Sequence, residues 1–391
     1  MRIALLAPLP PEQNDIADYA EAWSQAMRVG GVDVSTPLRG QTLSPYPLLL
    51  ARQMQKVDWG AVDLVHAELG GGNEFLALEW LAENHPDLPL TATAHDPERL
   101  VWRPMRLPGP LALAERLPRP LYLMAALLAD PLLLARERSL AARLSRLVSL
   151  TAGGAQCLAQ KMRLPSGRVL HIAHGNQPLP AEPLPPVHPL KLLYFGFISR
   201  GKGIEDLLRA LAILGRTRPR LPVELKLTLA GGAVLGRAGS DLERLKEHAR
   251  RLGLSESMLE WRLNVPIGQV PRLVQSHHAL ALPCRASPKS AWLGRRRGGH
   301  GVLSWAAACG RSVVSSDAFV QAEEVSRGYG AVYPQGDCQA LARELGRLLD
   351  EPQLLAERGE RAADLGRERA WPRIAEQFRQ VFEPLRRSRA E

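Results

Sequence analysis

Short apolar runs alternate with longer amphipathic segments along most of this chain of 391 residues. The runs are rich in Leu, Val, Ile and Ala and predict buried strands, and the segments between them repeat apolar residues at helical spacing. Strands are predicted at 3–6, 32–35, 64–67, 90–94, 147–150, 169–172, 192–195, 225–229, 259–263, 279–282, 312–315 and 331–333, and helices over, for example, 16–27 and 242–252. Repeated strand–helix–strand units build a parallel sheet with helices on both faces, and here they form two sets. We therefore predict an α/β fold with two doubly wound, Rossmann-like domains.

A proline-rich segment at 178–189 separates the two sets. Proline at this density continues neither a helix nor a central strand, so we expect a semi-rigid linker with the domain boundary inside it. The prediction is an N-terminal domain at 1–184 and a C-terminal domain at 185–370. A regular apolar stripe predicts a terminal helix in the remaining residues, 371–391.

One strand–loop–helix unit carries a candidate anion site. The strand at 192–195 is followed by Gly196, and a loop containing Ser199, Arg200 and Lys202 leads into a helix. Free backbone N–H groups and the dipole at a helix N-terminus favour negative charge, and the two basic side chains add mobile positive charge. This combination suits a diphosphate. The alternative is an ordinary turn whose basic residues are solvated.

A second candidate segment begins with a strand that ends at Pro283. A loop with three arginines at 295–297 follows, and a helix then opens with Gly301, Val302 and Leu303. The start of this helix again offers free backbone N–H groups to an anion. A plain α/β segment with no binding role is the competing interpretation.

In order and spacing, these two segments resemble the donor side of retaining glycosyltransferases with the GT-B fold, in the large family 4. The resemblance covers nearly the whole chain and is strongest at 190–335. It implies two Rossmann-like domains facing a cleft, with a nucleotide sugar bound chiefly by the second domain. It also implies that the terminal helix at 371–391 crosses back to the N-terminal domain. The donor-binding positions that it implies are Gly196, Ser199, Lys202, Arg296, Gly301, Val302, Leu303 and Ser304. Lys202, Arg200 and the helix opening at Gly301 would assist departure of the nucleoside diphosphate.

The chain departs from the family pattern at the start of that helix. Many members carry two glutamates eight positions apart there, and Arg296 and Ser304 occupy those positions in this sequence. The second glutamate usually binds the donor ribose, whereas a serine could make only one such bond. The alternative to an active enzyme is therefore a catalytically silent relative that acts as a scaffold or partner in polysaccharide assembly.

In the first half of the chain, His95 and Asp96 end a strand, which is where open sheets bind ligands. The family often has such a histidine near the transferred sugar, so the resemblance implies a catalytic role for His95 in the sugar pocket; a satisfied loop histidine is the alternative. Asn14 and Asp15 occupy a turn that normally carries glycine in the family, and the simpler interpretation is an N-cap of the next helix. His174 precedes the linker and either serves the cleft or packs. Acceptor or cleft contacts are thus predicted for Asn14, Asp15, Asp96 and His174.

The resemblance implies transfer of a hexosyl group from a UDP- or GDP-sugar to a glycan or lipid-linked acceptor, with retention, in bacterial polysaccharide or glycoconjugate synthesis. No bound metal and no cofactor besides the nucleotide-sugar co-substrate are expected, because basic residues and a helix N-terminus would neutralise the leaving diphosphate. No nucleophile is evident, which favours a same-face mechanism over a covalent intermediate. A nucleotide-dependent oxidoreductase is disfavoured, since no Gly-x-Gly-x-x-Gly follows the first strand.

The formal net charge of +10 suggests an acidic partner. A nucleotide or an anionic membrane surface suits this charge; nucleic acid is not expected, because no zinc-finger spacing or RNP-type strand occurs. Residues 112–147 carry Leu on one side and Arg on the other, which indicates packing helices or an interfacial membrane surface. Four scattered cysteines and the lack of an apolar run of about 20 residues predict a cytoplasmic protein. Peripheral contact with the inner face of the membrane is compatible with this prediction.

Overall fold

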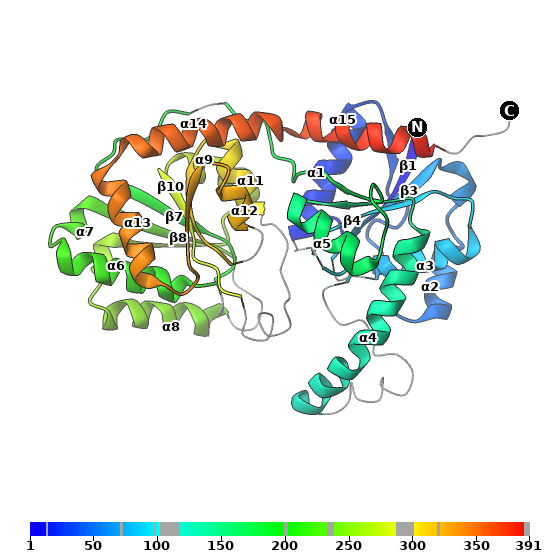
Figure 1. Cartoon of the computed structure of the whole chain (residues 1–391), viewed down its shortest axis with the longest axis horizontal. Coiled ribbons are helices and arrows are strands. Elements are labelled where there is room, and N and C mark those ends of the chain that lie inside the picture. The colour runs from blue at the N-terminus through cyan, green and yellow to red at the C-terminus, as the bar shows by residue number, and fades with distance from the viewer. Residues whose placement is uncertain are drawn as a thin grey trace. The chain divides into compact units, whose positions relative to one another are not determined.

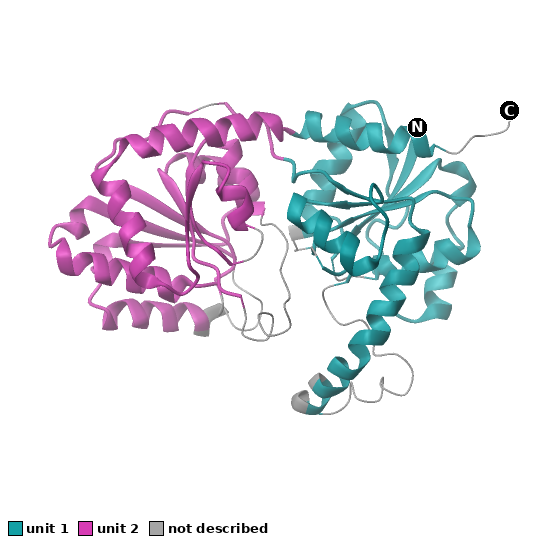
Figure 2. Ribbon diagram, viewed as in Figure 1, with its two compact units in different colours: residues 1–175, 371–391 teal, residues 176–370 magenta. Residues whose placement is uncertain are grey.

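The computed structural model describes residues 1–12, 15–70, 73–96, 98–101, 118–180, 182–198, 202–232, 238–286, 301–318 and 321–386. The chain forms two compact units, residues 1–175 with 371–391 and residues 176–370 (Figure 2). Each unit contains a six-stranded parallel sheet with helices on both sides (Figure 1). The predicted α/β class with two doubly wound sheets is therefore confirmed, and every predicted strand lies within two residues of its expected bounds.

The sheet of the first unit has the order β2-β1-β3-β4-β5-β6. Its strands are β1 (Arg2–Leu6), β2 (Asp33–Ser35), β3 (Leu64–Leu69), β4 (Leu90–Ala94), β5 (Arg146–Ser149) and β6 (Val169–His171). Its helices are α1 (Asp15–Val29), α2 (Pro47–Met54), α3 (Glu74–Asn84), α4 (Arg119–Arg143), α5 (Ala152–Met162) and, from the end of the chain, α15 (Trp371–Phe382). From β1, the chain adds β2 on one side and β3 to β6 on the other side of the sheet. A topological switch point therefore lies between β1 and β3.

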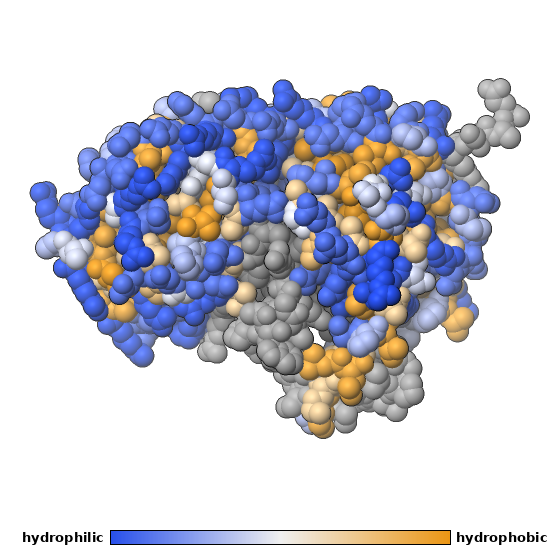
Figure 3. Space-filling view, in the orientation of Figure 1, coloured by the Kyte–Doolittle hydropathy of each residue, from blue (hydrophilic) through white to orange (hydrophobic). Residues whose placement is uncertain are grey.

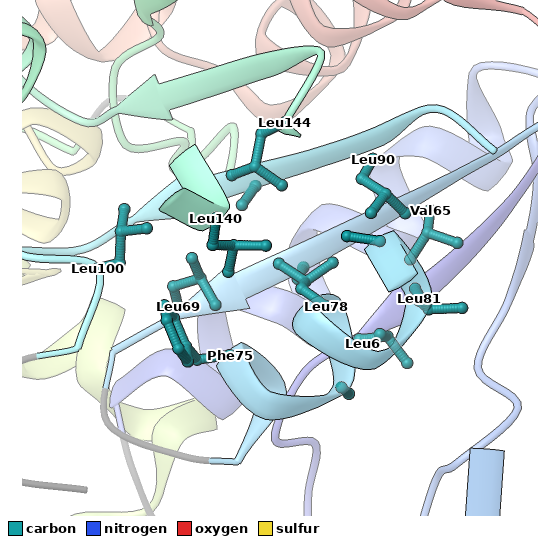
Figure 4. Close-up of a cluster of buried hydrophobic side chains, with 14 of the residues drawn as sticks. Leu6, Val65, Leu69, Phe75, Leu78, Leu81, Leu90, Leu100, Leu140 and Leu144 are labelled. Atoms are coloured by element: carbon teal, nitrogen blue, oxygen red, sulfur yellow. The ribbon is translucent and has the colours of Figure 1, made fainter. Parts of the chain in front are cut away.

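One face of this sheet is buried under α3 and α4 (Figure 4). Val65 and Leu90 from the strands pack with Phe75 of α3 and Leu140 of α4, and all four side chains are almost completely shielded from solvent. Successive strand residues point to opposite faces, so the uninterrupted apolar runs of the sequence fill two cores, one on each side.

The other face of the sheet is covered by α1 and α15. Ile3 and Leu5 of β1 pack with Trp23 of α1 and with Phe378 and Phe382 of α15. The helix α15 therefore completes the core of the first unit, although the whole second unit separates it in the sequence from the rest of that unit.

The sheet of the second unit has the order β12-β11-β10-β7-β8-β9. Its strands are β7 (Leu190–Phe195), β8 (Leu225–Gly231), β9 (Leu259–Leu263), β10 (Ala279–Leu282), β11 (Ser312–Ser316) and β12 (Gly330–Tyr333). Its main helices are α6 (Ile204–Thr217), α8 (Ala238–Arg251), α9 (Val270–Gln275), α11 (Gly301–Ala308), α12 (Gln321–Val325), α13 (Cys338–Asp350) and α14 (Gln353–Glu368). The direction of the order reverses between β7 and β10, which are paired neighbours.

The proline-rich segment is fastened to the second unit, which begins at Asn176 rather than near residue 184. The fastening residue is Arg311, whose side chain is buried and carries no carboxylate partner among the described residues. Its guanidinium donates to the carbonyl oxygens of Glu182, Pro183, Gln275, His277, Cys309 and Gly310. Nearby, Nε2 of His278 donates to the carbonyl of Pro185 at 3.0 Å. Prolines lack an N–H group but keep a carbonyl, so two buried basic side chains fix a segment that can join no sheet.

The first half of α4 presents apolar side chains to solvent. They are Leu121, Met124, Leu127, Leu128 and Leu132, which are 48% to 71% exposed. This part of α4 extends away from the sheet of its unit, and Figure 3 shows apolar surface at its end. The second half is anchored, because Arg99 pairs with Glu137 inside the unit. Within the described residues, no helix is long and apolar enough to cross a membrane.

Candidate functional site

The two sequence segments predicted to bind the donor meet at one edge of the second sheet. Gly196 directly follows β7, and Pro283 directly follows β10. These strands flank the point where the strand order reverses, and open parallel sheets bind ligands outside the carboxyl ends of the strands at such a point. The fold therefore brings both segments to the place where a ligand is expected.

Gly203 joins these two segments through backbone contact. It precedes α6 with a φ of +74°, and a Cβ atom on it would lie 1.5 Å from the carbonyl oxygen of Pro283. Glycine alone permits this conformation and this approach. Lys202, which directly precedes Gly203, is half-buried.

A second pair of glycines closes the same edge. Gly196 has a φ of +145°. A Cβ atom on Gly231, at the end of β8, would lie 1.7 Å from the carbonyl oxygen of Gly196. The ladder continues past the strands, since the N–H of Ile198 donates to the carbonyl of Gly232 at 3.0 Å. Ser199 and Arg200, which come next, lie outside the described residues.

An ion pair that the sequence analysis missed ties α6 to the end of β10. Arg285 follows Pro283 by two positions and binds both carboxylate oxygens of Asp206 in the first turn of α6, with Nη2 2.5 Å from Oδ1. Asp206 is buried, and this bond raises the pKa of Arg285. A negative side chain at a helix N-terminus would compete with an anionic ligand, so its pairing with Arg285 restores the local charge balance.

The helix predicted after the arginine-rich loop is α11, which is described from Gly301 onward. Gly301 and Val302 are partly exposed, whereas Leu303 and Ser304 are buried. The side chains of Leu303 and Ser304 therefore lie in the interior of the second unit. Arg296 lies outside the described residues.

In the first unit, His95 follows β4 and lies in a cluster of aromatic and polar groups. Its Nε2 is 2.8 Å from Oε2 of Glu68, a buried residue of β3. The ring of Tyr19 is 4.9 Å from the His95 ring and 4.9 Å from the His174 ring, so Tyr19 of α1 lies between two histidines predicted separately. Nδ1 of His174 donates to the carbonyl of Gly175 at 2.6 Å.

Two other predicted residues of the first unit lie next to β4 and in α1. Oδ1 of Asp96 accepts a bond from the N–H of Glu98 at 2.8 Å, which shapes the turn after β4. Asp15 is the first residue of α1. Asn14 lies outside the described residues.

Sequence reasoning missed two buried glutamates in this unit. Glu68 is fully shielded and bonded to His95, and burial raises its pKa. Glu74, the first residue of α3, follows β3 at the switch point, and burial raises its pKa to about 7. The sequence could have indicated Glu68, because it lies inside an apolar strand. Burying a carboxylate there costs free energy unless the carboxylate has hydrogen-bonding or charged partners.

In the part of the chain that the structure describes, no group of three or more His, Cys, Asp or Glu side chains is placed to hold a metal ion.

Comparison with known proteins places these features in a family context. Residues 177–365 match the model of the family described as "Glycosyl transferases group 1". A D-inositol 3-phosphate glycosyltransferase from Streptomyces griseus is 30% identical over 223 residues. That match covers 56% of this chain and 42% of the relative, so it spans less than half of the relative's length.

Solved structures with the same fold match nearly the whole chain. HepE from Anabaena, in complex with UDP, has a TM-score of 0.67 at 18% identity and covers 98% of this chain and 100% of its own. Sucrose-phosphate synthase from Thermosynechococcus elongatus has a TM-score of 0.69 at 16% identity, with coverages of 98% and 99%. At these identities the likeness concerns the fold.

Proposed function

We propose that this chain transfers a sugar from a nucleotide-sugar donor to an acceptor hydroxyl, because it has the GT-B fold and its residues 177–365 match the model of the group 1 glycosyl transferases. The observation that carries the proposal is the contact of Gly203 with Pro283. It holds Lys202 and the start of α6 at the switch point of the second sheet, where a diphosphate would find a cation and free backbone N–H groups.

The proposed donor is a UDP- or GDP-sugar bound by the second unit. Lys202 and Arg200 bind the diphosphate, and the backbone N–H groups of Gly301, Val302 and Leu303 face the phosphates or the sugar. UDP is the first choice, because HepE has been crystallised with UDP and with UDP-glucose. Further donor contacts are proposed for Gly196, Ser199, Arg296 and Ser304.

The proposed reaction retains the anomeric configuration and needs no metal. The bond between the anomeric carbon and the phosphate oxygen breaks, and the acceptor oxygen bonds to the same face of that carbon. The acceptor proton passes to the leaving phosphate, whose negative charge is stabilised by Lys202, Arg200 and the start of α11. His95 lines the sugar pocket.

The proposed acceptor is a glycan or a lipid-linked saccharide of a bacterial polysaccharide or glycoconjugate pathway, bound by the first unit. Asn14, Asp15, Asp96 and His174 are the proposed contacts. The exposed apolar side chains of α4 support a lipid-linked acceptor, because such a surface suits peripheral contact with a membrane.

Calorimetric titration with UDP and with uridine tests the proposed donor site. Lys202→Ala is expected to weaken UDP binding by about 1.5–3 kcal/mol, which is typical of a charge-assisted hydrogen bond, and to leave uridine binding nearly unchanged. Lys226→Ala, which removes an exposed lysine of β8, is the matched control and should bind UDP as the wild type does. Equal losses for UDP and uridine would contradict the assignment of Lys202 to the diphosphate. Binding of UDP without sugar transfer would identify the alternative, a silent scaffold.

A further inference from the structure

Two adjacent strands of the first unit carry a buried polar ladder. His66 and Glu68 on β3 lie beside Thr91 and Thr93 on β4, and all four residues are completely shielded from solvent. Residues two apart on a strand face the same side, so the four side chains share the face covered by α1. Trp23 of α1 stacks on the His66 ring at 4.9 Å.

Hydrogen bonds fix the orientation of this ladder. Thr91 donates its single hydroxyl proton to the carbonyl of Val65 at 3.1 Å, so it must accept a bond from Nδ1–H of His66 at 2.9 Å. Nε2 of His66 consequently faces Oε1 of Glu68 at 3.2 Å and the hydroxyl of Thr93 at 3.1 Å. Oε1 of Glu68 thus lies beside Nε2 of His66, and these two atoms can bond only through a proton that they share.

The other carboxylate oxygen reaches the predicted site. Oε2 of Glu68 lies 2.8 Å from Nε2 of His95, the residue that follows β4 and is the partly exposed member of the cluster. A fully buried carboxylate costs several kcal/mol unless charged or hydrogen-bonded partners compensate for it, and an apolar residue would fill the same space without that cost. A role in orienting His95 would explain why a carboxylate occupies this position.

We propose that Glu68 is a positioning residue for His95: it accepts the Nε2 proton of the imidazole, fixes the ring at the carboxyl end of β4, and stabilises its protonated form. The bond leaves Nδ1 as the basic nitrogen of the neutral ring. His95 then meets the sugar with one tautomer and one orientation. This inference rests on the proposed function for the role of His95, but the bond itself can be tested independently.

Three other titratable groups lie close to His95 among the described residues. Tyr19 of α1 faces the His95 ring, and burial raises its pKa well above the ordinary range, so it stays neutral at physiological pH. His66 of β3 contacts Glu68, and the ring of His174 lies against Tyr19. Glu68 is bonded directly to His95.

The test follows the ring nitrogens of His95 by NMR in the full-length chain labelled with ¹⁵N-histidine. The His95 signals are assigned by their loss in His95→Asn, and the pH is varied from 5 to 9. In Glu68→Gln the titration midpoint of His95 is expected to fall by about one pH unit or more, a tenfold loss of proton affinity, with a mixed tautomer in the neutral ring. Glu68→Asp retains the charge and should recover part of the shift. If Glu68→Gln does not fold, the His95 midpoint of Glu68→Asp is compared with that of the wild type. A lower midpoint in Glu68→Asp supports the proposal, and an unchanged midpoint contradicts it.

Thr91→Val is the matched control, because it disturbs the same buried ladder at His66 and leaves the Glu68–His95 bond in place. Its His95 midpoint should match that of the wild type. An unchanged midpoint and tautomer in Glu68→Gln would overturn the proposal, and so would an equal shift in Thr91→Val.

Turnover of UDP-glucose provides the second readout. Glu68→Gln is expected to lower kcat at least tenfold while leaving the Kd for UDP unchanged, since UDP is bound by the other unit. A shifted tautomer with unchanged kcat would overturn the positioning role. A wild type that shows no turnover would contradict the proposed function, and the NMR result would still decide whether Glu68 controls His95.

Discussion

A Cβ atom on Gly203 would lie 1.5 Å from the carbonyl oxygen of Pro283, so the loop before α6 and the end of β10 are in direct backbone contact. Between these residues, the chain passes through β8, β9 and β10 before it returns to the same edge of the sheet. The backbone packing of Gly203 thereby fixes the backbone position of Lys202, the residue before it.

Gly203→Ala should destabilise the second unit and abolish the donor site together. We expect a loss of at least about 3 kcal/mol in the free energy of unfolding, because the new methyl group meets backbone that cannot turn aside. Urea denaturation measures this loss, and UDP calorimetry on the folded fraction measures the site.

Gly253→Ala provides the matched control. Gly253 has a φ of +72°, close to that of Gly203, but a Cβ atom on it would meet no other atom within 4 Å. Its substitution should cost only the conformational penalty, about 1 kcal/mol, and leave UDP binding intact. Similar losses in the two variants would show that the contact with Pro283 is unimportant.

Glu74 predicts a specific dependence of stability on pH. Burial raises its pKa from 4.5 to about 7 in the folded chain, so between these values the unfolded chain has lost a proton that the folded chain retains. The contribution of Glu74 to the free energy of unfolding therefore falls by at most about 3 kcal/mol as the pH rises from 4.5 to 7. Above pH 7 this contribution no longer changes with pH.

Glu74→Gln removes this titration. The variant should be more stable than the wild type at pH 7.5 and nearly equal to it at pH 4.5, as measured by thermal or urea unfolding. A stability difference that does not vary between pH 4.5 and 7.5 would contradict the raised pKa of Glu74.

The exposed face of α4 predicts binding to lipid vesicles. Met124, Leu128 and Leu132 are each more than half exposed, and transfer of such side chains into a membrane interface is favourable by about 1.5 kcal/mol each. Sedimentation with anionic vesicles should therefore carry the wild type down, and replacement of the three residues by Gln should weaken binding at least tenfold.

Leu48→Gln controls for the loss of any exposed leucine, because Leu48 is 81% exposed on α2 of the same unit. It should bind vesicles as the wild type does. A wild type that stays in the supernatant at low ionic strength would favour a water-soluble acceptor.

The strands were predictable because both sheets are buried on two faces, so each strand is an unbroken apolar run such as Leu190–Phe195. The meeting of Gly196 and Pro283 at one edge was predictable in outline, since both follow strands in a parallel sheet. The contact of Gly203 with a specific carbonyl oxygen was not, because a backbone approach depends on the register of β7 and β10.

Polar contacts between residues far apart in the sequence could not be predicted from it. Arg311 looks like one arginine among many, yet it binds the carbonyls of the proline-rich segment more than 120 positions earlier in the chain. Glu68 and His95 come from different strands, and their bond depends on the pairing of β3 with β4. Such contacts follow from the three-dimensional register and leave no periodic pattern in the sequence.

Transfer of a sugar from a nucleotide sugar with retention is the activity proposed for this chain. It is measured by NMR analysis of the products formed from UDP-, GDP- and ADP-sugars with a panel of glycan and lipid-linked acceptors. We expect release of a nucleoside diphosphate, preferably UDP, and a new glycosidic bond with the same anomeric configuration as the donor. A product of inverted configuration, or UDP binding with no transfer to any acceptor of the panel, would contradict the proposal.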